Sequence, residues 1–170
     1  GPVIWFVNSA AAAGGNGTLA SPFNTLAAAD AVDAVNHGIF LYTGTYTTGL
    51  ALNSGESLIG QGVNGASFDA IFGISPPAGT ISRPAIAGAR PTVQGTVTLN
   101  TNSTVRGLNL STGASTGLSD PAAAITGVTV SEVGVTATTG TAVNLNGVGG
   151  SISLTSVSST GAASGIVLNN

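Results

Sequence analysis

From Thr92 onward the chain repeats one four-residue pattern: a small residue, an apolar residue, usually a polar residue, and a second apolar residue. The pattern recurs at 96–99, 107–110, 127–130, 142–145, 151–154 and 165–168. Alternation with a period of two places both apolar side chains on the same face of a β-strand. Each copy is therefore predicted to be a short strand with one buried face.

The spacing of these strands constrains the fold most strongly. Gly127 and Ser151 differ by 24 in residue number, Ala142 and Gly165 by 23, and Gly107 and Gly127 by 20. A period of about 20 to 24 residues, with short strands and Gly/Asn turns, predicts one coil of a solenoid. Stacked coils share a core, and each backbone amide finds its partner in the neighbouring coil. A β-sandwich is the alternative, but it does not predict this spacing.

The composition narrows the class of protein. Only 5% of the 170 residues are charged, with no Cys and a net charge of −3. Ordinary domains carry about 25% charged residues. Three isolated Arg and no Lys argue against nucleic-acid binding. No apolar run approaches the ~18 residues of a membrane-spanning helix. We therefore expect a single folded, β-rich domain that binds no nucleic acid and inserts into no membrane.

A short helix is predicted near the N-terminus, after a strand over 3–7 and a small-residue loop. Ser is a favoured N-cap and Pro a favoured first helical residue, so Ser21-Pro22 marks its start, with Asn24 as an alternative cap. The helix is expected to run through Val35 and to end at Gly38. Asp30 and Asp33 fall on its exposed face. The residues expected to form this cap are Ser21, Pro22, Phe23, Ala28, Ala31, Val32 and Val35.

The chain divides into three zones on this interpretation. Residues 3–62 form the N-terminal cap and the first coil, with strands expected at 39–46, 50–53 and 57–59. Residues 63–91 contain several prolines, which break regular structure, so this zone is expected to leave the core while its aromatic residues still dock. Residues 92–170 form regular coils, which we expect to continue into a longer solenoid beyond the C-terminal end.

Several motifs of residues 3–62 occur in an order typical of one family. They are Trp5-Phe-Val-Asn8, Gly14-Gly-Asn-Gly-Thr18, Ser21-Pro-Phe-Asn-Thr-Leu26, Thr43-Gly-Thr-Tyr46 and Ser57-Leu-Ile-Gly-Gln-Gly62. Together they resemble the N-terminal cap and first coils of pectin-lyase-like proteins. The resemblance implies an all-β fold, a right-handed parallel β-helix with a short N-terminal capping α-helix. The family includes polysaccharide lyases, hydrolases, tailspikes and the passenger stalks of bacterial adhesins and autotransporters, and the Lys-free, Cys-free coils look most like those stalks.

No catalytic, cofactor or metal site is predicted. A lyase of this fold would need clustered carboxylates for calcium and an Arg or Lys as base. The carboxylates are scattered, and the only one near coil spacing from Arg106 is Glu132. Gly60 to Gly65 match G-x-G-x-x-G, but no clear helix or suitably placed acidic residue follows, so a glycine turn is favoured over a dinucleotide site. The single histidine, His37, cannot form a metal site alone.

We expect a non-enzymatic structural or adhesive module of a large secreted or cell-surface bacterial protein. Its partner would be a host-surface or extracellular polysaccharide or protein. The alternative is the N-terminal part of a carbohydrate-active or carbohydrate-binding β-helix whose active coils lie beyond residue 170. Tyr42 and Tyr46 are the candidate carbohydrate contacts, whereas Trp5 is expected to pack in the core or the cap. Threonine rows such as Thr96/Thr98 and Thr136/Thr138 suggest ice binding, but their spacing does not repeat between coils.

Overall fold

The computed structural model describes residues 1–170, which form two helices and thirteen strands. In chain order they are β1 (Ile4–Val7), α1 (Leu26–Asp30), β2 (Gly38–Leu41), β3 (Thr45–Tyr46), β4 (Leu50–Ala51), β5 (Ser57–Gly60), α2 (Phe68–Phe72), β6 (Thr92–Val93), β7 (Val97–Thr98), β8 (Thr104–Thr112), β9 (Leu118–Ser119), β10 (Ile125–Ala137), β11 (Val143–Asn146), β12 (Val148–Ser159) and β13 (Ile166–Asn169). Neither helix is long enough to cross a membrane.

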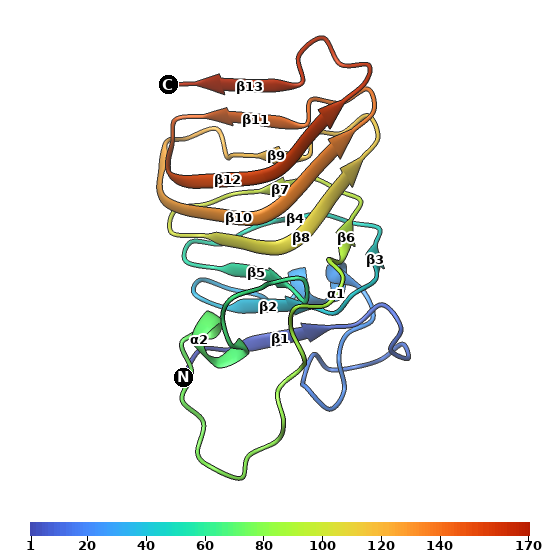
Figure 1. Ribbon diagram of the computed structural model, residues 1–170, viewed down its shortest axis with the longest axis vertical. Helices are drawn as coiled ribbons and strands as arrows, with labels where there is room; N and C mark the ends of the chain where they lie inside the picture. The colour runs from blue at the N-terminus through green and yellow to red at the C-terminus, as the bar shows by residue number, and fades with distance from the viewer.

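The strands form two sheets in which every pairing between these strands is parallel. The first sheet has the order β1-β2-β5-β8-β10-β12, with β3 and β6 paired beside it, and the second has the order β4-β7-β9-β11-β13. Figure 1 shows the strands stacked from β1 at the N-terminal end to β12 and β13 at the other. The fold is therefore all-β and solenoid-like, because the chain alternates between the two sheets and each pass lies on the previous one.

The register places apolar residues in continuous rows inside the stack. One row consists of Ile39, Leu58, Val105, Val130 and Ile152, each paired with the next in the neighbouring strand. The first four are almost completely buried and belong to the main core, which extends from Val7 to Leu145. The predicted strands and their stacking are confirmed, because each copy of the four-residue pattern overlaps a strand of one sheet or the other.

The predicted spacing between coils was only partly correct. Val143 pairs with Ile166, which confirms the predicted interval of 23 in the second sheet. In the first sheet, Arg106 pairs with Ser131, a difference of 25 in residue number, so Gly107 and Gly127 are not equivalent positions. This interval of 25 is the same along the whole pairing of β8 with β10, so it places Gly107 opposite Glu132, and both residues have positive φ. The pairing of β10 with β12, by contrast, shifts between Val130 and Val133.

The predicted helix over 21–35 was wrong in extent. It spans only Leu26–Asp30, with Thr25 as the N-cap whose hydroxyl accepts a hydrogen bond from Ala28 N at 3.2 Å. The preceding segment is extended because Phe23 forms a parallel bridge with Val7, and Ser21 bridges Thr18. Pro22 lies between these two bridged residues and not at the first position of a helix.

The buried face of α1 also differs from the predicted one. Leu26 and Ala29 are buried in the main core, whereas Val32 and Val35 are exposed. Ala28 is half-buried and Ala31, the C-cap residue, is exposed. Because α1 contacts both β1 and β4, its two buried residues lie against the N-terminal end of the core.

The segment between β5 and β6 leaves the stack and carries a second, smaller core on the outer face of the first sheet. Phe6 and Phe40 are neighbours in register, and Phe68 of α2 packs on both. The buried members of this outer cluster are Phe6, Phe40, Ile59, Val63 and Phe68. Figure 1 shows the rest of the segment as a loop that extends past β1, and we call residues 61–91 the excursion. The expectation that its aromatic residues dock is confirmed.

Candidate functional site

Arg106 of β8 and Glu132 of β10 form an ion pair on the outer face of the first sheet. Two contacts join them: Nε to Oε2 at 3.1 Å and Nη2 to Oε1 at 3.3 Å. Arg106 Nη2 also donates to Asn64 O at 2.8 Å, and Asn64 N donates to both carboxylate oxygens of Glu132 at 3.3 and 3.4 Å. The structure thus brings together the two charges noted in the sequence, and it adds the backbone of the excursion, which no sequence pattern could place there.

This arrangement is suited to holding the excursion in place. Two parallel hydrogen bonds to a carboxylate fix the orientation of an arginine side chain, because its planar guanidinium presents its donors in a rigid arrangement. Glycoside hydrolysis commonly needs two carboxyl groups about 5–9.5 Å apart. Here one carboxylate faces one guanidinium, and the donors and acceptors of both are directed at the Asn64 backbone. The chemistry that this triad supports is structural attachment.

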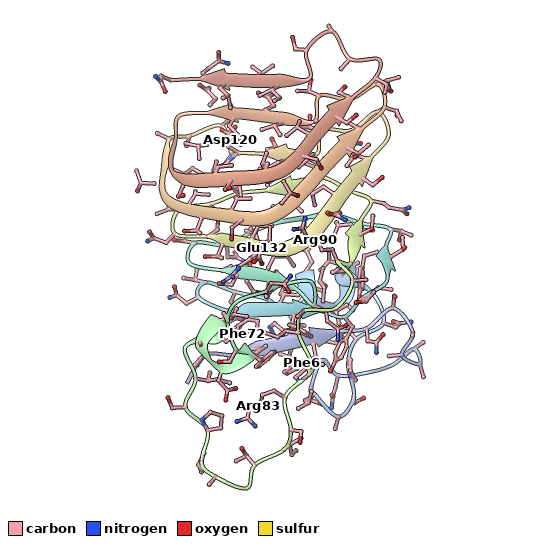
Figure 2. All side chains as sticks on the ribbon, in the orientation of Figure 1. Phe6, Phe72, Arg83, Arg90, Asp120 and Glu132 are labelled. Atoms are coloured by element: carbon pink, nitrogen blue, oxygen red, sulfur yellow. The ribbon has the colours of Figure 1, made fainter.

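The other two arginines hold the same segment. Arg83 forms an ion pair with Asp69, with Nε 2.8 Å from Oδ1, inside the excursion. Arg90 donates from Nη1 to Thr155 Oγ1 at 2.7 Å and so joins the end of the excursion to β12. Figure 2 shows Arg83 in the lower loop and Arg90 at about the level of β8. All three arginines of the chain are therefore used to fix the excursion.

The glycine motif at 60–65 serves close packing between coils. A Cβ on Gly60 would lie 2.3 Å from Gly107 O, and one on Gly62 would lie 2.3 Å from Arg90 Cγ. The N–H of Gly62 already donates to Gly107 O at 3.1 Å. A helix does follow, contrary to expectation, since α2 begins at Phe68 after Ser67 as N-cap. The turn amides are nevertheless engaged within the protein, which agrees with the predicted glycine turn.

A cavity of about 250 Å³ lies beside the N-terminal end of the core. Its lining comes from the loop after β1, the start of α1 and the β3–β4 connection: Ser9, Asn24, Thr25, Leu26, Ala27, Thr45, Tyr46, Thr47 and Thr48. None of these side chains is charged. The side chains of Asn24, Thr45, Thr47 and Thr48 make no hydrogen bond within the protein, so their amide and hydroxyl groups are available to a ligand.

The tyrosines predicted to contact carbohydrate are not open stacking surfaces. Tyr46 is only 2% exposed. Its hydroxyl lies 2.7 Å from Tyr42 O and 3.0 Å from Val7 O and accepts a hydrogen bond from Ser9 N. Burial raises the pKa of Tyr46 to about 12 and also raises the pKa of Tyr42. Tyr42 is half-buried with its ring edge-on to Phe40, so Tyr46 contributes a neutral wall to the cavity and Tyr42 packs with the outer cluster.

Trp5 and His37 pack together in the cap region. Trp5 Nε1 donates to His37 Nδ1 at 3.1 Å, and the indole lies 5.9 Å from the Phe23 ring. The expectation that Trp5 packs in the core or the cap is confirmed, because Trp5 packs against the main core. His37 therefore accepts a structural hydrogen bond.

Two acidic residues that are separate in the sequence are brought together by the fold. The sequence pattern predicts Asp33 on an exposed helical face and Glu56 as an isolated carboxylate. Both instead accept hydrogen bonds from Asn53 Nδ2, at 3.1 and 3.2 Å. Asp33 lies beyond the end of α1, so its position is set by contact with the β4–β5 turn.

No group of three or more His, Cys, Asp or Glu side chains is arranged to hold a metal ion. Comparisons with protein-family models, curated proteins and solved structures find no match to this chain.

Proposed function

We propose that this chain is a right-handed parallel β-helix that serves as a non-enzymatic structural module of a large secreted or cell-surface bacterial protein. The observation that carries the proposal is the continuous in-register stacking of both sheets over a single core. Parallel coils that share a core and a hydrogen-bond ladder form a stiff, quasi-one-dimensional rod. Stiffness along one axis is the property that a stalk or spacer requires.

The outer surface of the rod agrees with this role. In the first sheet, Ser57, Thr104, Thr129 and Ser151 follow one another in register across four strands. These neutral hydroxyl groups are solvated without introducing repulsion between neighbouring coils, whereas like charges stacked directly opposite each other would destabilise the sheet. Thr98 and Thr136 lie in different sheets, so the threonine rows considered for ice binding do not form one surface.

The enzymatic alternative is tested directly. The full chain is incubated with a panel of neutral and acidic polysaccharides, and both new reducing ends and unsaturated sugar products are measured. We expect no depolymerisation by the wild-type protein. Measurable activity that is lost in Arg106→Gln or Glu132→Gln, but kept in the surface control Thr129→Val, would overturn the proposal.

A second candidate, carbohydrate binding without catalysis, is favoured by one observation, the uncharged polar cavity beside α1. Its volume of about 250 Å³ is below the range of about 300–1,000 Å³ typical of drug-sized ligands, so a single sugar unit is the suitable size. The free polar groups of Asn24, Thr45, Thr47 and Thr48 match the hydroxyls of a neutral sugar.

The carbohydrate candidate predicts that neutral oligosaccharides bind and that Thr47→Val weakens binding by about tenfold, equivalent to one hydrogen bond. Titration calorimetry measures both. Thr129→Val, on the outer face of β10 and away from the cavity, is the matched control and should bind like wild type. Equal weakening by both variants, or no binding of any neutral sugar, would exclude this cavity as the site.

A further inference from the structure

The most unusual polar group in the protein is the side chain of Glu56, which is 0% exposed. It lies in the turn between β4 and β5, where Oε2 accepts hydrogen bonds from Asn53 N at 2.7 Å and from Asn53 Nδ2 at 3.2 Å. The same Nδ2 donates to Asp33 Oδ1 at 3.1 Å. One amide group therefore holds two carboxyl groups that come from separate segments of the chain.

Each carboxyl group has one oxygen that Asn53 does not contact. Glu56 Oε1 and Asp33 Oδ2 are both buried, and neither has a hydrogen-bond partner. A buried polar atom without a partner costs about 1–3 kcal/mol, and a buried unpaired charge costs more. A single proton between the two carboxyl groups removes both penalties, because it provides one donor and cancels one charge. Glu56 and Asp33 lie beside each other, because the same Asn53 Nδ2 contacts both carboxyl groups.

The surroundings offer no cation to stabilise two ionised carboxylates. The segment after α1 contributes Asp33 and His37, whose Nδ1 is occupied by Trp5, and α1 itself contributes Asp30. The turn of the next coil, residues 100–103, contributes only Asn, Thr and Ser. The three arginines are held at the excursion by other partners.

We propose that Glu56 and Asp33 share one proton between Oε1 and Oδ2, and that this hydrogen bond acts as a pH-sensitive latch between the segment after α1 and the β4–β5 turn. The acid latch consists of Asp33, Asn53 and Glu56. Above the pH at which the shared proton is lost, the two carboxylates repel each other and the latch opens.

The acid latch is placed to control the N-terminal end of the solenoid. Beside it, Asn36 N donates to Ser54 O and Ser57 N donates to His37 O, both at 3.0 Å, so residues 33–37 lie directly over the β4–β5 turn. Leu26 and Ala29 of the preceding helix contribute to the main core. Opening of the latch therefore loosens the segment that connects α1 to β2 and exposes this end of the core.

The direction of the pH effect follows from the titration of Glu56. Burial, followed by the neighbouring Asp33, raises the pKa of Glu56 to about 8, from an ordinary value of 4.5. Since the folded state holds the proton more tightly than the unfolded state, the stabilisation is complete below about pH 4.5 and is lost as the pH rises through about 8. Burial, and then Asp33, also raise the pKa of Asp30.

The first test follows unfolding of the full chain by denaturant at about pH 6 and about pH 9. We expect a lower unfolding midpoint at the higher pH in the wild type. Glu56→Gln keeps the shape, and its amide can donate to Asp33 Oδ2 without titrating, so the pH dependence should disappear. Asp30→Asn removes one negative charge nearby while leaving the latch intact, and should retain the wild-type pH dependence. An undiminished pH dependence in Glu56→Gln would overturn the proposal.

The second test does not depend on any variant folding. The ¹³C carboxyl resonance of Glu56 is followed by NMR in the wild-type chain across the same pH range. We expect a titration midpoint near 8. A midpoint near the ordinary value of 4.5 would show that no proton is shared and would refute the latch. The proposal is independent of the structural or carbohydrate-binding role of the rod.

Discussion

Residues 65–84 of the excursion should detach from the first sheet without unfolding of the coils when Phe68 is replaced by alanine. Phe68 is buried in α2, and its ring contacts three other aromatic rings. It is stacked on Phe6 at 5.9 Å, edge-on to Phe40 at 5.2 Å and tilted against Phe72 at 4.8 Å. Among the aromatic pairs, only those of Phe68 connect α2 to both β1 and β2.

The expected loss of stabilising free energy is large compared with the other interactions that hold α2 on the first sheet. Replacement of a buried Phe by Ala costs about 3–5 kcal/mol. A five-residue helix has little stability of its own. The outer cluster is separate from the main core, so the main core keeps its packing. The base of the excursion also keeps the Arg106–Asn64 and Arg90–Thr155 hydrogen bonds, so we expect release of residues 65–84 only.

Limited proteolysis with thermolysin, which cleaves beside bulky apolar residues, measures this release. Phe68→Ala should be cut near α2 much faster than wild type, while its far-UV circular dichroism stays that of a β-sheet protein. Ser75→Asn is the matched control because Ser75 is an exposed residue of the excursion and its replacement removes no apolar cleavage site, so it should be cut at the wild-type rate. The reasoning is refuted if Phe68→Ala loses its β-sheet signal in the same transition, or if cleavage is no faster than in the control.

Two further pairs of substitutions test the stacking of coils, with the free energy of unfolding measured in denaturant. Gly55→Ala places a Cβ 2.0 Å from Asn36 Oδ1 at φ +71°, whereas Gly65→Ala imposes a similar φ of +74° in open space. Both should lose about 1–3 kcal/mol to backbone strain, and Gly55→Ala should lose more, so equal losses would contradict the close approach. Leu108→Ala should cost about 2–5 kcal/mol because Leu108 is completely buried, while Leu168→Ala, at a site 68% exposed, should cost much less. Similar costs at the two leucines would contradict a core centred on the middle coils.

Strands such as β11 could be predicted from the sequence because their residues alternate between buried and exposed. The pattern at 142–145, for example, marks β11 to within one residue at each end. The strands β8, β10 and β12 are longer than predicted, since they bend and continue beyond the apolar pair. For β8 and β10, the bend coincides with positive φ at Gly107 and Glu132. A glycine is a visible signal for such a conformation, but a glutamate is not.

The register could not be predicted because one local pattern serves both sheets. The copies at 96–99 and 107–110 look alike, yet they belong to the second and first sheets respectively. In addition, coils of the first sheet differ in length. Thr104 pairs with Thr129, and Thr129 pairs with Ser151, so the interval in residue number falls from 25 to 22. Turns and bulges absorb this difference, so sequence distance alone does not identify partners.

The polar sites could not be predicted for the same reason, because they too depend on which distant segments of the chain lie side by side. The acid latch depends on the segment after α1 lying over the β4–β5 turn, and the predicted longer helix directed Asp33 into solvent instead. Helix propensity favoured that longer helix because the segment is rich in alanine. The bridge between Phe23 and Val7 and the hydrogen bond from Asn36 N to Ser54 O outweigh it at the two ends.

The chain has few charged residues because its regular coils do not require them. Regular coils satisfy their backbone through the ladders and bury apolar rows, so they require no ionised groups. Most of the charged residues occur where the chain departs from that regularity: Arg83 with Asp69, Arg90 and Arg106 with Glu132 fix the excursion, and Asp33 with Glu56 fixes the connection after α1. Asp120 similarly accepts from Asn146 N at 2.9 Å beside the second sheet. A substitution that removes Arg83, Arg90 or Arg106 should therefore loosen the excursion and leave the stacked coils folded.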